Sequence, residues 1–183
     1  NGETPVSDAD LTSHLENKMY KLAYYSIPLY NSSTYAFADD DQKDTMLRLA
    51  QAAVDSYNAS APADAVSQFT AFHEVSSAAL SGIYAVLDST VPTDGTASLQ
   101  TELLSSSTLD SAFSTEGSAD TIRSLSFGQA VAVQYSSLSM MLAVRLDPLD
   151  GAVLDDVRAQ VLADMKSDEL QDALAAYGAS MQH

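Results

Sequence analysis

The side chains best suited to chemistry in this chain are histidines in segments of helical periodicity. His73 falls within the apolar stripe of residues 64–87, the longest apolar-periodic run of the sequence. An imidazole there is either a neutral core histidine, hydrogen-bonded to a carbonyl or a tyrosine, or a ligand or proton carrier in a cavity between helices. His14 lies in an earlier segment of helical spacing, residues 8–27.

These histidines, with the acidic residue that follows His73, are the candidate metal ligands: His14, His73 and Glu74. They can share one ion only if their two helices pack antiparallel with the histidines at the same height, and the sequence does not determine that height. Oxygen-rich ligand sets favour Ca²⁺, Mg²⁺, Mn²⁺ or ferric iron over soft metals. No pattern identifies a particular metal or organic cofactor.

An aromatic band provides a second candidate site. Tyr20 and Tyr24 lie on the predicted first helix, and Phe69 precedes His73 by one helical turn. Together these four residues predict a pocket between helices for a small apolar or metal-containing ligand. Tyrosines at the end of a bundle also serve as packing residues whose hydroxyl groups stay in water, and this is the alternative interpretation.

Motifs that would indicate an enzyme are missing from the sequence. It contains no His-x-x-x-His, His-Glu-x-x-His or Glu-x-x-His metal motif, no Gly-x-Ser-x-Gly elbow and no glycine-rich phosphate loop. The chain has no cysteine, which excludes disulfides, zinc–thiolate sites and a cysteine nucleophile. The sequence therefore predicts no catalytic residue and favours a non-catalytic protein, with an enzyme or metalloprotein of unrecognised site as the remaining alternative.

The charge of the chain is strongly negative, with 25 acidic and 8 basic residues and a formal net charge of −17. Such a surface repels phosphate backbones, so nucleic acids and anionic membrane surfaces are poor partners, and we expect no nucleic acid to bind. This acidity is typical of a salt-adapted host, of an extracellular protein or of a cation-binding surface. Because salt screens self-repulsion, we expect the melting temperature to rise with NaCl.

Localisation is predicted from the ends and turns of the sequence. No apolar run is long enough to span a bilayer. The chain begins at Asn1 instead of Met, which favours an extracellular, periplasmic or cell-surface protein after cleavage of a leader. Two sequons, at Asn31 and Asn58, predict N-glycosylation in exposed turns.

The periodicity predicts an all-α fold, an up-and-down bundle of about four to six helices forming one domain over residues 1–183. A Ser/Thr-rich segment at about 88–119 is predicted to be irregular, with short helical pieces near 98–104 and 109–113. The expected longer helices cover residues 8–27, 40–57, 64–87, 120–146, 150–165 and 168–177.

Three functional hypotheses follow from these patterns. The first is a non-catalytic extracytoplasmic binding module that holds its small ligand between helices. The second is a structural or self-assembling surface protein, in which helices bury one another between subunits. The third is a metal-binding protein that uses Asp, Tyr and His ligands.

Overall fold

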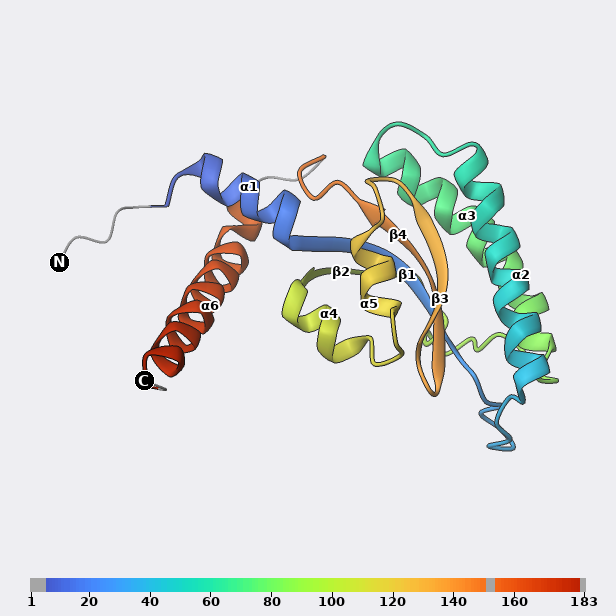
Figure 1. Cartoon of the computed structure of the whole chain (residues 1–183). Coiled ribbons are helices and arrows are strands. Elements are labelled where there is room, and N and C mark those ends of the chain that lie inside the picture. Colours follow the sequence, from blue (N-terminus) through green and yellow to red (C-terminus); the bar gives the residue numbers. More distant parts are fainter. Residues whose placement is uncertain (1–5, 151–153, 182–183) are drawn as a thin grey trace.

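In the computed structural model, which describes residues 6–150 and 154–181, a four-stranded antiparallel sheet has helices on both faces (Figure 1). The all-α prediction is therefore wrong, and the fold is mixed α/β. The strand order in the sheet is β2-β1-β4-β3. The strands are β1 (Met19–Pro28), β2 (Gln100–Ser105), β3 (Ala130–Ser136) and β4 (Ser139–Leu146).

The predicted first helix ends nine residues early and continues as a strand. α1 (Asp8–Lys18) is capped by the Ser7 side chain, which accepts a hydrogen bond from the Asp10 amide at 3.1 Å. β1 then pairs with both β2 and β4. Because helices cover both faces of β1, apolar residues point to both sides, and the strand lacks the two-residue alternation by which a half-buried strand is recognised.

The helix predicted over 120–146 is also wrong. The structure places there a short helix, α5 (Ser118–Arg123), followed by the hairpin of β3 and β4. Gly128 has a positive φ of 82°, which a helix interior does not allow, and it lies between α5 and the hairpin. The piece predicted as helical near 98–104 is mostly β2. A short apolar run fits a strand as well as a helix, so periodicity cannot distinguish the two.

Two predicted helices are confirmed, and they cover one face of the sheet (Figure 1). α2 (Asp40–Ala59) starts with a capping box in which Asp39 and Gln42 bond each other's backbone amides. α3 (Ala65–Ala85) is capped by Asp64, whose side chain accepts a hydrogen bond from the Ser67 amide.

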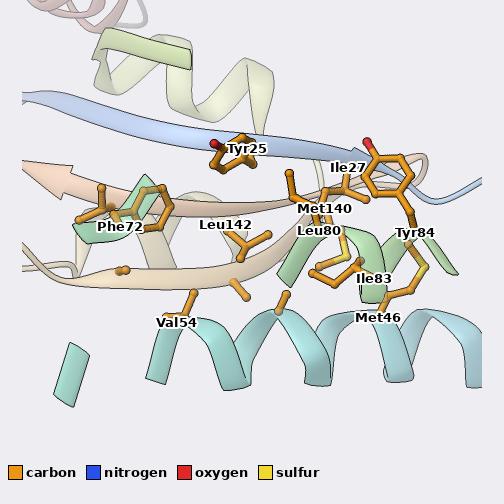
Figure 2. Close-up of a cluster of buried hydrophobic side chains, with 14 of the residues drawn as sticks. Tyr25, Ile27, Met46, Val54, Phe72, Leu80, Ile83, Tyr84, Met140 and Leu142 are labelled. Atoms are coloured by element: carbon orange, nitrogen blue, oxygen red, sulfur yellow. The ribbon is translucent and has the colours of Figure 1, made fainter. Parts of the chain in front are cut away.

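The main core lies between this helical pair and the sheet (Figure 2). Residues at i, i+4 and i+8 of α2 point toward the sheet, which is the spacing of one helical face. Alternate residues of the strands face them, so the side chains interlock at the sheet surface. The fully or nearly fully buried members include Tyr25, Ile27, Met46, Val54, Phe72, Ile83, Met140 and Leu142.

The opposite face of the sheet is covered by α4 (Ser106–Ala112) and α5. Leu109 from α4 and Ile122 from α5 are fully buried against Leu22 of β1. The Ser/Thr-rich segment therefore contains an edge strand where a helical piece was predicted near 98–104, whereas α4 overlaps the helical piece predicted near 109–113.

α6 (Leu154–Ser180) packs against α1 at one end of the sheet and then extends away from it (Figure 1). It is one continuous helix where the sequence predicted two. Val161 is buried with Leu11, Leu15 and Met19, whereas the second half of the helix is exposed. Four apolar side chains in that half and just after it are 60–69% exposed: Leu170, Leu174, Tyr177 and Met181.

Candidate functional site

The sheet separates the four residues that were predicted to share a pocket. Tyr20 and Tyr24 belong to the cluster on the α4/α5 face. Phe69 and His73 lie on α3, which covers the other face. The structure therefore places the two tyrosines on one face of the sheet, and Phe69 and His73 on the other.

His73 is exposed, so the core-histidine interpretation is wrong about its burial. Its Nδ1 lies 2.5 Å from the hydroxyl of Tyr25, and the two rings are stacked with centroids 6.1 Å apart. Burial raises the pKa of Tyr25 above its ordinary value, which keeps the phenol protonated. We therefore assign the hydroxyl as the donor and His73 Nδ1 as the acceptor. This hydrogen bond links α3 to β1.

The other two predicted side chains lie in different surroundings. Phe69 lines a shallow pocket of about 250 Å³ with Val66, Leu146 and Lys21. On the opposite face, burial and a hydrogen bond with Glu102 raise the pKa of Tyr24 to about 12. Tyr24 is thus a neutral hydrogen-bonding residue across the β1–β2 pair.

The most unusual side chain of the α4/α5 face is Arg145, which the sequence analysis did not single out. It projects from β4 and is 9% exposed. Its Nη1 donates to the carbonyl of Leu125 at 2.8 Å, and its Nη2 donates to the carbonyl of Glu16 at 3.2 Å. The guanidinium thus ties the C-terminal turn of α1 to the chain that follows α5.

These two bonds leave part of the guanidinium unused. Its Nε is buried without a hydrogen-bond acceptor in the described part of the chain. None of the ion pairs found among residues 6–150 and 154–181 includes Arg145. Burial lowers the pKa of Arg145 from its ordinary value, with Tyr20 opposing the shift. A buried cation without a carboxylate partner is rare, because desolvation of the charge is costly.

Two aromatic rings flank this cation. The Arg145 Cζ lies 4.6 Å from the ring centroid of Tyr20 and 4.9 Å from that of Phe127, which are cation–π distances. Phe127 is 41% exposed, so one side of the arrangement faces solvent. A pocket of about 320 Å³ opens here, and its lining also includes Glu16, Asn17, Ser126 and Arg123. We call this the Arg145 pocket.

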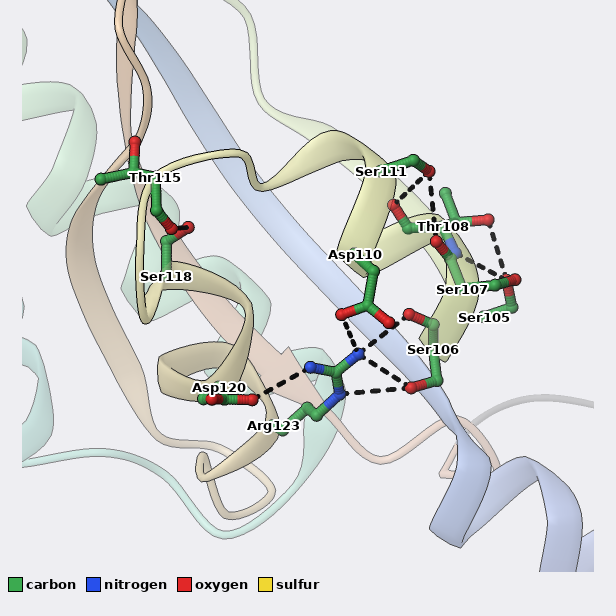
Figure 3. A network of polar contacts seen from close by, with 10 residues as sticks. All are labelled: Ser105, Ser106, Ser107, Thr108, Asp110, Ser111, Thr115, Ser118, Asp120 and Arg123. Atoms are coloured by element: carbon green, nitrogen blue, oxygen red, sulfur yellow. Dashed lines mark hydrogen bonds and ion pairs between the residues drawn. The ribbon is translucent and has the colours of Figure 1, made fainter.

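Arg123 borders the pocket, but its charge is already balanced (Figure 3). It contacts Asp110 at 2.6 Å and Asp120 at 3.1 Å, and it donates to the carbonyl and hydroxyl oxygens of Ser106. These contacts raise the pKa of Arg123 further, with the hydrogen bond to Asp110 as the largest cause. Arg123 therefore fixes α4 against α5, whereas Arg145 is the cation of the pocket that has no carboxylate partner among the described residues.

His14 takes part in a different cluster from the predicted one. Its Nε2 lies 2.7 Å from Asp164 Oδ2 on α6, and one ligand atom each of His14, Asp164 and Asp168 lie within 4.8 Å of one another. The structure brings neither His73 nor Glu74 to this cluster. A His–Asp pair 150 positions apart could not be found by local spacing.

The asparagines of both sequons use their amide groups in structural hydrogen bonds. Asn31 is 8% exposed and donates to the carbonyl of Leu87 at 2.9 Å, which leaves little room for a glycan. Asn58 is exposed at the end of α2 and exchanges two bonds with the backbone of Ala130. Glycosylation remains a prediction at both positions.

Comparisons with known proteins do not suggest a function: no family model, curated protein or solved structure matches the chain. Within the part of the chain that is described, every helix is too short or too polar to cross a membrane. A signal for the Arg145 pocket does exist in the sequence, because Arg145 is the single charge in the apolar run Met140–Leu146.

Proposed function

We propose that this protein is a non-catalytic binding module whose ligand occupies the Arg145 pocket. The observation that carries the proposal is the buried Arg145 guanidinium, which lacks a carboxylate partner among the described residues and keeps an N–H without an acceptor. A ligand carboxylate placed against it supplies a charge-assisted hydrogen bond of the strong, short kind. It also offsets the cost of keeping the cation out of water.

The walls of the pocket support a particular ligand class. Phe127 is 41% exposed and offers an apolar ring beside the polar groups of the lining, and a volume of about 320 Å³ accommodates a small molecule. We therefore propose a small carboxylate with a flat apolar body as the ligand. This differs from the ligand held between helices that the sequence suggested. The excess of acidic residues still supports a salt-rich or extracytoplasmic location.

The test compares three probes of similar shape: benzoate, benzamide and benzylammonium. Binding is followed by isothermal titration and by amide chemical shifts of residues 123–129 at constant ionic strength. We expect benzoate to bind in the millimolar range or tighter, benzamide to bind more weakly and benzylammonium not at all. If none of the three shifts these resonances, or if all three bind equally, the proposal is wrong.

Matched variants separate binding from folding. Phe127→Ala changes an exposed ring and should weaken benzoate by about tenfold, ~1.4 kcal/mol. Phe37→Ala removes a ring that is 69% exposed in another part of the chain and should leave the affinity unchanged. Arg145→Lys keeps the charge but loses the bidentate fork, so it should lower affinity in a protein whose chemical shifts elsewhere are native.

A second candidate function, self-assembly, is supported by the exposed stripe of α6. Val161 and Leu170 are nine positions apart, about 900° of helix rotation, so the exposed stripe lies on the side opposite to the one that packs on α1. Fully burying a large apolar side chain contributes ~1.5–3 kcal/mol. Complete burial of the eight stripe residues of two copies therefore contributes about 12–24 kcal/mol at most, which is enough to offset the ~4–15 kcal/mol that association costs.

Sedimentation velocity in low and in molar NaCl tests this second candidate. We expect association that strengthens with salt, because the partners are strongly acidic. Leu174→Gln should abolish it, whereas Ala175→Gln, which places the same side chain off the stripe, should not. A wild-type chain that stays monomeric at high concentration in molar salt would contradict self-assembly.

A further inference from the structure

We propose that His14, Asp164 and Asp168 form a divalent metal site that joins α1 to α6. The site is distinct from the Arg145 pocket and independent of the function proposed for it. Its three side chains come from two helices at opposite ends of the sequence, so the fold itself assembles the ligand set.

The geometry suits coordination by one ion. Asp164 and Asp168 are four positions apart on α6, so both carboxylates lie on the same helical face, toward His14. Two atoms that each lie ~2.0–2.2 Å from a metal are at most about 4.4 Å apart. The three ligand atoms already lie within 4.8 Å of one another, so small side-chain rotations close the site.

The two carboxylates of the cluster favour a bound cation. The side chains of His14 and Asp164 are only 10% and 11% exposed, and their atoms lie 2.7 Å apart. Either the Nε2–H of the neutral imidazole donates to Asp164 Oδ2 at this distance, or the Nε2 lone pair and the carboxylate oxygen bind one metal ion together. Asp168 brings a second carboxylate to the same point, and no Lys or Arg pairs with either aspartate among the described ion pairs.

The mixed ligand set indicates the class of metal. One imidazole nitrogen with two carboxylate oxygens suits Zn²⁺ or Mn²⁺, whereas Ca²⁺ and Mg²⁺ prefer oxygen ligands alone. Asp168 is exposed, so water can complete the coordination on that side. The metal that we propose is therefore Zn²⁺ or Mn²⁺, bound by three protein ligands and solvent.

The position of the cluster suggests what the metal does. Val161 of α6 is buried against α1, and Asp164 lies one turn further along, close to where the helix leaves the rest of the protein. An ion held by both helices at this point would fix the direction in which the exposed half of α6 projects. Metal binding would stabilise the docked α6 and raise the melting temperature.

The experiment uses the full chain without an affinity tag, stripped with EDTA and titrated with ZnCl₂ by calorimetry and thermal denaturation. We expect one equivalent to bind and the melting temperature to rise. Asp168→Asn removes one ligand at an exposed position and should weaken Zn²⁺ by at least tenfold. Asp172→Asn, one turn further along α6, loses the same charge and should bind like the wild type.

Mn²⁺ provides the site-specific measurement. As a paramagnetic ion it should broaden the ring resonances of His14 at low occupancy and leave those of His73, on α3, sharp. Equal broadening of both histidines, equal Zn²⁺ affinity of Asp168→Asn and Asp172→Asn, or the absence of stoichiometric binding would each overturn the proposal.

Discussion

The amide of Asn58 makes the contact whose removal can be predicted most fully. Asn58 ends α2, and its side chain bonds the edge strand β3 twice: Nδ2 donates to the Ala130 carbonyl at 3.0 Å, and Oδ1 accepts from the Ala130 amide at 2.9 Å. The side chain thus replaces the strand that is missing from this edge of the sheet. Ala130 is 3% exposed, so water cannot easily take over either bond.

The size of the effect follows from the two bonds. Asn58→Ala leaves two buried backbone groups without partners, and each unsatisfied group costs ~1–3 kcal/mol. Allowing for partial relaxation, we expect a loss of about 2–4 kcal/mol in the free energy of unfolding. For a chain of this length that is a fall of about 4–16 °C in melting temperature. Urea denaturation monitored by circular dichroism measures it, with an unchanged m-value.

The sequon at this position supplies the matched control. Ser60→Ala abolishes the same Asn58-Ala59-Ser60 sequon. The Ser60 side chain makes no hydrogen bond in the described structure, and the hydrogen bond that ends α2 uses the Ser60 backbone N–H. Any effect of a missing glycan is therefore common to both variants. The reasoning fails if Asn58→Ala is within about 0.5 kcal/mol of Ser60→Ala, the usual range for surface substitutions.

Three further outcomes are expected. Gly128→Ala should destabilise the fold more than Gly95→Ala in urea denaturation, because both glycines have positive φ but only at Gly128 would a Cβ meet the side chain of Gln68. Burial raises the pKa of Tyr57 to about 12 from 10.0, so the neutral phenol stabilises the fold below pH 10, and this contribution, ~2.7 kcal/mol, is lost as pH rises toward 12. Tyr57→Phe should therefore flatten the alkaline fall of stability in denaturation curves between pH 10 and 12, and an unchanged slope would contradict the assignment. The melting temperature of the wild type should rise with NaCl, because screening relieves the self-repulsion of a net charge of −17, and a flat salt titration would contradict it.

The helices that were predicted correctly are those with one buried face. α2 and α3 each place apolar residues against the sheet and polar residues in water, so the 3.6-residue period is visible in the sequence. Their caps, Asp39 and Asp64, are local signals that need no tertiary context.

The strands were missed because of their position in the middle of three layers. β4 is buried along nearly its whole length, since α2 and α3 lie on one face and α4 and α5 on the other. Such a strand is apolar at consecutive positions, and periodicity cannot distinguish it from a buried helix. Valine is frequent in residues 130–146 and is enriched in strands, but an apolar run of this length also fits a buried helix. For α6 the prediction divided one helix into two. Its two halves are apolar on opposite sides of the helix, so their sequences resemble two separate helices.

The candidate site could not be predicted from the sequence for a related reason. Arg145 faces Tyr20 because β4 pairs with β1 in the register that sets Arg145 beside Leu22, and pairing of strands about 120 residues apart is not encoded in local spacing. An arginine in an otherwise apolar strand must find partners within the fold, and here the protein supplies two carbonyls and two rings but no carboxylate among the described residues. We propose that an anionic ligand is the remaining partner, and this makes the Arg145 pocket the place to look for one.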